Sequence, residues 1–169
     1  MSAGREFWGF SLAVYRQPGV PEECLALQER LGADVNLLLL CAYLGAKRNA
    51  LLARSDIEAA VAASTAWHVD VVRKLRAARQ ALKPWEGRDK ELQDSARTLR
   101  SAVKKLELDA ERIEHDLLAN WARGRNFQTS SPDAAVPANI RMLVEYYRSL
   151  DKGASLPNNL IAAALSLAS

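Results

Sequence analysis

Residues 35–46 read VNLLLLCAYLGA, and this stretch decides the fold. Asp34 before it is a good helix N-cap, and we expect the helix to run to about Lys47. Apolar residues occupy every side of that helix, and Asn36 is the only polar residue in the stretch. A helix that is hydrophobic all round belongs in the middle of a protein, because it has no face to present to water. The sequence therefore predicts a central helix with other helices packed around it.

The rest of the chain is punctuated by proline and glycine and shows no alternation typical of strands. Ser55 and Glu58 match a capping box at the start of a helix. Residues 123–137 are predicted as a polar loop. Helical patterns predict further helices over residues 6–15, 21–32, 55–63, 65–83, 92–120, 137–150 and 158–167. The sequence thus predicts one all-α domain over residues 1–169, a bundle of about six to eight helices around the central one.

A heptad pattern runs through the longest of these helices. Its apolar residues are spaced alternately by four and three positions, which is typical of a helix that packs along a seam. They are Leu92, Ala96, Leu99, Val103, Leu106, Ala110, Ile113 and Leu117. The pattern leaves open whether the seam closes within one chain or between two. Glu111 and His115 lie one turn apart outside the seam, where we expect a solvent-exposed ion pair.

Composition and motifs exclude several classes of protein. A net charge of +3 is too small to identify a nucleic-acid binder by itself, and Cys24 and Cys41 lie in apolar stretches typical of core positions. The longest apolar run, residues 37–46, is far short of the ~20 residues that span a membrane. Since the N-terminus also lacks a secretory signal pattern, we expect a cytoplasmic protein with no membrane contact. No nucleophile elbow, phosphate loop or metal-ligand spacing is evident, so the sequence predicts no catalytic residue, metal or cofactor.

Three stretches form a distinctive combination, namely FWGFSLAVYRQPGVPEECLALQERLGADVNLLLLCAYLG, then VVRKLRAARQALK, then ELDAERIE. In these residues the chain resembles an uncharacterised proteobacterial family that carries only the label domain of unknown function 2390. The resemblance covers roughly residues 7–118, and it implies a small bacterial cytoplasmic protein. It implies no activity, cofactor or catalytic residue.

Four polar side chains fall on helix faces that are otherwise apolar. On a helical wheel of about 100° per residue, these inward residues are Gln28, Asn36, His68 and Arg79. Buried polar groups need partners, because an unpaired buried charge costs about 3–5 kcal/mol. We expect a structural network that fixes helix register, with the lining of a small polar or anionic ligand as the alternative. His68 and Arg79 are about 16 Å apart along their helix. We therefore expect Arg79 to group with Asn36 or Gln28, as a clamp on the central helix, and His68 to lie elsewhere.

Basic residues gather around the predicted bend at residues 84–87. Between Arg73 and Lys105 there are eleven lysines and arginines and four acids, whereas residues 106–120 carry five acids and one base other than histidine. The short bend should bring the basic ends of two antiparallel helices side by side, where they cannot neutralise each other. We expect a basic surface suited to a polyanion. Its residues are Arg73, Lys74, Arg76, Lys83 and Arg88.

These features leave three classes of function. The first is a helical protein-interaction or scaffold module, which binds a protein partner or a second copy through the seam or the charge-divided helix. The second is binding of nucleic acid or another polyanion through the basic hairpin, although no base-reading motif is evident. The third is a small-ligand or enzymatic site at the inward residues, although no nucleophile, acid–base pair or metal set is evident. We expect the first, because helical surfaces and charge asymmetry are the main features of the sequence.

Overall fold

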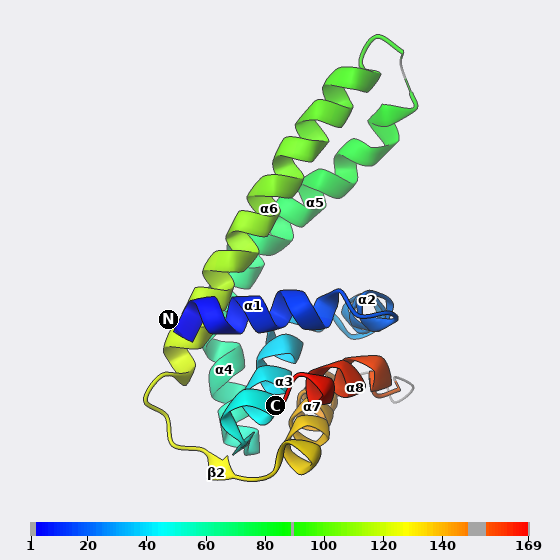
Figure 1. Cartoon of the computed structure of the whole chain (residues 1–169). Coiled ribbons are helices and arrows are strands. Elements are labelled where there is room, and N and C mark those ends of the chain that lie inside the picture. The colour runs from blue at the N-terminus through cyan, green and yellow to red at the C-terminus, as the bar shows by residue number, and fades with distance from the viewer. Residues whose placement is uncertain (1–2, 89, 149–154, 169) are drawn as a thin grey trace.

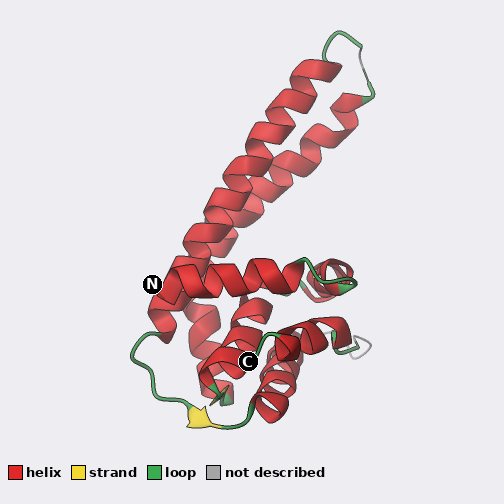
Figure 2. Cartoon of the chain, in the orientation of Figure 1, coloured by secondary structure: helices red, strands yellow, loops and turns green. Residues whose placement is uncertain are grey.

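The computed structural model describes residues 3–88, 90–148 and 155–168. Almost all ordered elements in these residues are helical, so the predicted all-α fold of six to eight helices is confirmed (Figure 2). The α-helices are α1 (Ala3–Tyr15), α2 (Val20–Leu31), α3 (Val35–Arg48), α4 (Arg54–Trp67), α5 (Arg73–Leu82), α6 (Gln93–Ala122), α7 (Pro132–Tyr147) and α8 (Asn158–Ser166). A π-helical turn η1 (His68–Val72) joins α4 to α5, and a 3-10 turn η2 (Lys83–Glu86) follows α5. The short strands β1 (Ala50–Leu51) and β2 (Gln128–Thr129) pair antiparallel.

The predicted central helix is α3. Its side chains are buried without a break from Asn36 to Ala46, and Leu38 and Leu44 are completely shielded from solvent. Asp34 caps the helix as predicted, since its Oδ1 accepts a hydrogen bond from the backbone N–H of Asn36 at 2.8 Å. Burial on all sides explains why this stretch carries no polar face.

Close packing of α3 against α7 forms the centre of the body. A Cβ atom at Gly45 would lie 2.8 Å from the backbone nitrogen of Val136, so only glycine allows the two helices to approach this closely. Asn139 of α7 is fully buried and ties β1 to this pair of helices. Its Oδ1 accepts from the Leu52 N–H at 2.8 Å, and its Nδ2 donates to the Ala50 carbonyl at 2.9 Å. This amide therefore satisfies buried backbone groups that would otherwise lack partners.

Two helices leave the body. Figure 1 shows α5 and the first half of α6 standing away from the remaining helices as a two-helix arm, which we define as residues 73–88 and 90–109. The second half of α6 returns to the body, where Leu118 and Ala122 are buried. An ion pair between Glu86 and Arg100 (3.2 Å) joins the two sides of the arm near its tip.

The predicted seam of α6 is only partly a packing surface. Its alternate members Leu92, Leu99, Leu106 and Ile113 are 48%, 53%, 54% and 46% exposed. Ala110 is buried, and Ala96 and Val103 are half-buried. The face of α6 that packs against neighbouring elements is shifted by one residue from the exposed row. It contains Arg100, Glu107 and Glu114, whose side chains contact residues of η2, α5 and η1.

Several predicted boundaries were wrong. Residues 54–82 form one continuous helical run instead of two helices, and the first turn uses Asp56, which accepts from the Ala53 N–H at 2.9 Å, in place of the Ser55 capping box. Helix α7 begins at Pro132, so the polar loop covers only residues 123–131 and Pro137 lies inside the helix. Pro132 suits the first turn, which needs no N–H donor there. The predicted end of this helix near residue 150 lies outside the described residues.

No helix in the described parts of the chain combines the length and the apolar character needed to cross a membrane.

Candidate functional site

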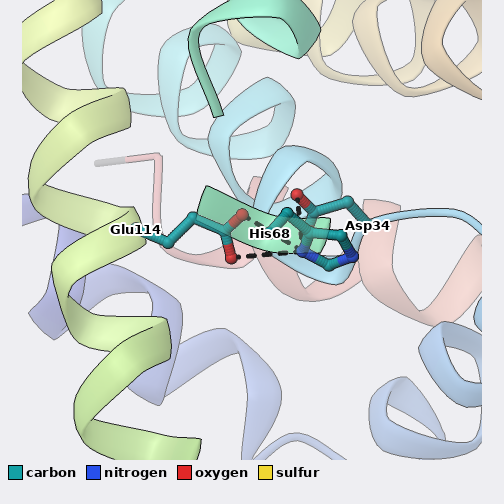
Figure 3. A group of neighbouring side chains, drawn as sticks. All are labelled: Asp34, His68 and Glu114. Carbon is teal, nitrogen blue, oxygen red and sulfur yellow. Dashed lines mark hydrogen bonds and ion pairs between the residues drawn. The ribbon is translucent and has the colours of Figure 1, made fainter. Parts of the chain in front are cut away.

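A buried polar cluster lies where the arm joins the body. It consists of Asp34 and Asn36 at the start of α3, His68 at the start of η1, and Glu114 in α6, and we call it the junction cluster. Figure 3 shows three of these residues, Asp34, His68 and Glu114. The π-turn is closed by a hydrogen bond from the Arg73 N–H to the His68 carbonyl, five residues apart. Such turns widen an α-helix locally and recur at functional sites.

The imidazole of His68 faces two carboxylates. Its Nδ1 lies 3.1 Å from Oε1 of Glu114 and 3.4 Å from Oδ2 of Asp34 (Figure 3). Both acids are almost completely buried, with 0% of Glu114 and 3% of Asp34 exposed. The ligand-type atoms of the three residues all lie within 4.8 Å of one another, close enough to share one metal ion.

Asn36 holds the outer oxygen of each carboxylate. Its backbone N–H donates to Oδ1 of Asp34 at 2.8 Å, and its side-chain Nδ2 donates to Oε2 of Glu114 at 2.5 Å. The remaining oxygens, Oδ2 of Asp34 and Oε1 of Glu114, are therefore directed at His68. Oδ2 of Asp34 is buried and accepts no hydrogen bond from any described residue.

The electrostatics of the junction cluster are strongly coupled. Burial, the largest cause, and the charge of Glu114 together raise the pKa of Asp34 to about 7, against the opposing effects of His68 and of the hydrogen bond from the Asn36 N–H. Desolvation lowers the pKa of His68, but the hydrogen bond to Glu114 and the charge of Asp34 outweigh it, so the net pKa is raised. The junction cluster therefore places two buried carboxyl groups against a single imidazole.

A second set of polar contacts lies further out, inside the arm. Arg76 donates to Glu107 at 3.0 Å and to Glu111 at 2.9 Å, and Arg79 donates to Glu107 through both Nε and Nη2. Desolvation raises the pKa of Glu107, but the hydrogen bonds from Arg79 and Arg76 outweigh it, and the net pKa is lowered. These contacts join α5 to α6 through charge where the arm has little apolar core.

Two clefts flank these contacts. The larger, of about 510 Å³, lies between the arm and helices α1 and α2, and it is lined by Trp8, Leu12 and Leu25 opposite Arg79 and Leu108. The smaller, of about 300 Å³, is lined in part by His68, Arg73 and Gln28. His68 thus contacts an opening toward solvent, whereas its two acidic partners are buried.

The inward residues do not group as the sequence predicted. Asn36 and His68 come together around Glu114, whereas Arg79 pairs with Glu107 inside the arm and so does not clamp the central helix. Gln28 is half-buried, and with Asn36 and Arg79 it lines the larger cleft. The prediction went wrong because α5 leaves the body with the arm, so its inward face meets α6 and not α3.

The predicted basic residues fall into two groups. Arg73, Lys74, Lys83 and Arg88 are exposed, whereas Arg76 is half-buried and paired with acids. Lys74 lies 3.4 Å from Asp70, and the Arg88 guanidinium lies 5.2 Å from the ring centre of Trp85.

The expectation that the arginines of α5 lie beside the basic half of α6 was wrong. Helix α6 begins only at Gln93, so its basic first turns lie opposite η2, as the contact of Arg100 with Glu86 shows. Glu107 and Glu111, near the middle of α6, then reach Arg76 and Arg79.

The expected ion pair of Glu111 with His115 was also wrong. His115 is 2% exposed, and its ring stacks on Phe7 with ring centres 4.3 Å apart. Glu111 pairs with Arg76 instead. The heptad frame placed His115 outward because it considered α6 alone, whereas α1 covers this face where α6 returns to the body.

Comparison with known proteins gives a family but no activity. Neither the curated proteins nor the solved structures include a match to this chain. The family described as protein of unknown function (DUF2390) matches residues 6–118, which span helices α1–α5 and most of α6, including all four residues of the junction cluster. The chain belongs to this family, as its resemblance in sequence indicated.

Proposed function

We propose that the chain is a helical interaction module that pairs with a second copy of itself through the arm. The observation that carries this proposal is a row of four large apolar side chains, each about half exposed. They are Leu92, at the N-cap of α6, and Leu99, Leu106 and Ile113 within the helix. Leu92 and Ile113 are 21 positions apart, which corresponds to about 32 Å of helix. Scattered exposed leucines are ordinary, but an aligned row of this length is typical of an interaction surface.

The spacing of the row fits a partner helix. Its members recur every seven residues, which keeps them on one side of a helix that winds around another. Within the arm, α5 covers only the neighbouring face of α6, where the charged residues Arg100 and Glu107 point inward. A second two-helix arm packed on the row would give a four-helix bundle and bury these side chains.

Charge favours a second copy in the antiparallel orientation. The first half of α6 exposes three basic residues, Arg97, Lys104 and Lys105, and one acid, Asp94. The second half exposes two acids, Asp109 and Asp116, and one base, Arg112, so the exposed charge changes sign along the helix. Antiparallel pairing places the basic half of one α6 against the acidic half of the other, whereas parallel pairing places like charges together.

The row itself is compatible with this symmetry. In an antiparallel pair with full overlap, Leu92 of one copy lies beside Ile113 of the other, and Leu99 lies beside Leu106. Every apolar side chain then meets another one, as a two-fold interface requires.

Sedimentation velocity over a range of concentrations tests this proposal. The wild-type chain should form a concentration-dependent dimer, and a double variant with Leu99→Glu and Leu106→Glu should remain a monomer. Ser101→Glu is the matched control, because Ser101 is exposed on the same helix but outside the row; it should still dimerise. A wild-type chain that is monomeric at every concentration, even if it captures an unrelated protein, would overturn the proposal.

A polyanion is the second candidate partner, and the tip of the arm favours it. Trp85 is 44% exposed there, with Arg88 over its ring, and such a pair offers both a stacking surface and a positive charge. Retention on a heparin column should fall in a variant with Lys83→Glu and Arg88→Glu, and its dependence on salt should flatten. Wild-type protein that passes through heparin at low salt would exclude this candidate.

We further propose that the module works in the bacterial cytoplasm. Cys24 and Cys41 are free and buried, and burial raises the pKa of Cys24 to about 12, so its thiol stays protonated and unreactive. Since neither cysteine forms a disulfide, neither requires the oxidising compartment in which disulfides form.

A further inference from the structure

We propose that Asp34, His68 and Glu114 bind one divalent transition-metal ion of the zinc class at the root of the arm. The three side chains come from α3, η1 and α6, and their ligand-type atoms lie within 4.8 Å of one another. This site is independent of the proposed pairing of the arms, because it lies in the body and uses none of the exposed row.

The distances fit such an ion. A tetrahedral zinc ion with bonds of about 2.0–2.1 Å holds its ligand atoms about 3.4 Å apart. Nδ1 of His68 lies 3.1 Å from Oε1 of Glu114 and 3.4 Å from Oδ2 of Asp34. One imidazole nitrogen with two carboxylate oxygens is a donor set that suits zinc or manganese, whereas magnesium and calcium prefer oxygen ligands alone.

Oδ2 of Asp34 has an ion-pair contact with Nδ1 of His68 at 3.4 Å but no hydrogen-bond donor among the described residues. This oxygen is buried, and because Asp34 is only 3% exposed, water does not supply the missing hydrogen bond. A buried carboxylate oxygen without a donor is costly. A cation between Asp34, His68 and Glu114 would satisfy it directly.

The charge of the site also calls for a cation. With both acids ionised and His68 neutral, as metal binding requires, the three side chains carry two negative charges in a buried site. A divalent ion balances that charge. Among the described residues, the imidazole of His68 forms ion-pair contacts with both acids, whereas the guanidinium of Arg76 is engaged by Glu107 and Glu111.

The surroundings of the three residues are built as in a metal site. Asn36 holds Oδ1 of Asp34 and Oε2 of Glu114, which leaves one oxygen of each acid directed toward His68. Groups that orient metal ligands in this way are a regular part of protein metal sites. His68 lines the smaller cleft of about 300 Å³, so the site borders a solvent-accessible opening on the side of His68.

Isothermal titration of the wild-type chain with zinc chloride alone tests the proposal. We expect one ion per chain and no comparable binding of magnesium chloride. Asp34→Asn should weaken zinc binding by more than about tenfold. The asparagine keeps an oxygen that can cap α3, and its amide nitrogen replaces Oδ2, the oxygen that would bind the ion. Circular dichroism should therefore show an unchanged helix content. Ser64→Ala, at a buried position outside the site, is the control and should bind zinc like the wild type.

A nitrogen-15 spectrum of the imidazoles decides the question on the wild-type chain even if the variant fails to fold. The chain has two histidines, and His115 is packed against Phe7 in the core. Zinc should move the Nδ1 resonance of His68 to a metal-bound value and leave that of His115 unchanged. Absence of stoichiometric zinc binding, or binding without any change at His68, would overturn the proposal.

Discussion

His115 should make the stability of the protein depend on pH. Its ring is 2% exposed and lies against Phe7 and Trp8, and burial lowers its pKa from 6.5 to about 4. In the unfolded chain the same side chain takes up a proton near pH 6.5. Between pH 6.5 and pH 4 the unfolded state therefore binds more protons than the folded state, and acidification should reduce the free energy of unfolding. A difference of this size corresponds to about 3 kcal/mol.

Urea unfolding followed by circular dichroism at pH 7 and pH 4 measures this effect. Other groups also titrate in this range, so the comparison needs His115→Phe, which keeps an aromatic ring in the stack but cannot take up a proton. The difference in unfolding free energy between wild type and variant should shift by about 3 kcal/mol in favour of the variant as the pH falls. Parallel pH profiles for the two proteins would refute the assignment of His115 as a buried neutral ring.

Three further substitutions test the packing. Leu39→Ala in α3 should lower the free energy of unfolding by ~2–5 kcal/mol in urea titrations, because Leu39 is buried in the central helix; a loss below ~1 kcal/mol would mean that α3 is not central. Glu107→Gln should speed hydrogen exchange of the arm amides but not of the body, since it leaves Arg76 and Arg79 without their shared counter-charge; unchanged exchange in the arm would contradict this role. Asn139→Ala should cost about 2–4 kcal/mol, because two buried backbone groups lose their partners, and a near-neutral result would argue against that role.

The central part of the fold could be predicted from the sequence. The apolar run of α3 has no polar face, so it had to be surrounded, and its cap at Asp34 is a local interaction. The start of α7 was missed because Pro137 normally ends or begins a helix, whereas here Pro132 occupies the first turn and Pro137 is tolerated inside. Local signals predicted the elements, and their boundaries depended on packing.

The junction cluster could be predicted only in part. Helical wheels placed Asn36 and His68 inward, and Asp34 was identified as the cap beside Asn36. Glu114, which joins them, lies in another helix and was counted only in the net charge of residues 106–120. The sequence does carry a signal for Glu114. Arg100, Glu107 and Glu114 recur every seven residues, and each directly follows a member of the apolar row. Charged residues at this spacing can be recognised as a buried polar face only when the helix that packs against them is known.

Disulfide cross-linking between variants that each carry one added cysteine tests the antiparallel pairing of the arms most directly. Leu99→Cys and Leu106→Cys are prepared separately and mixed under mild oxidation; Cys24 and Cys41 are buried and do not compete. Antiparallel arms bring position 99 of one copy beside position 106 of the other, so the mixture should give a dimer linked between the two variants. Each variant alone should cross-link poorly, since its two cysteines lie about 10 Å apart along the helix. Efficient cross-linking of each variant with itself would indicate parallel arms, and no cross-linking in the mixture would contradict the pairing.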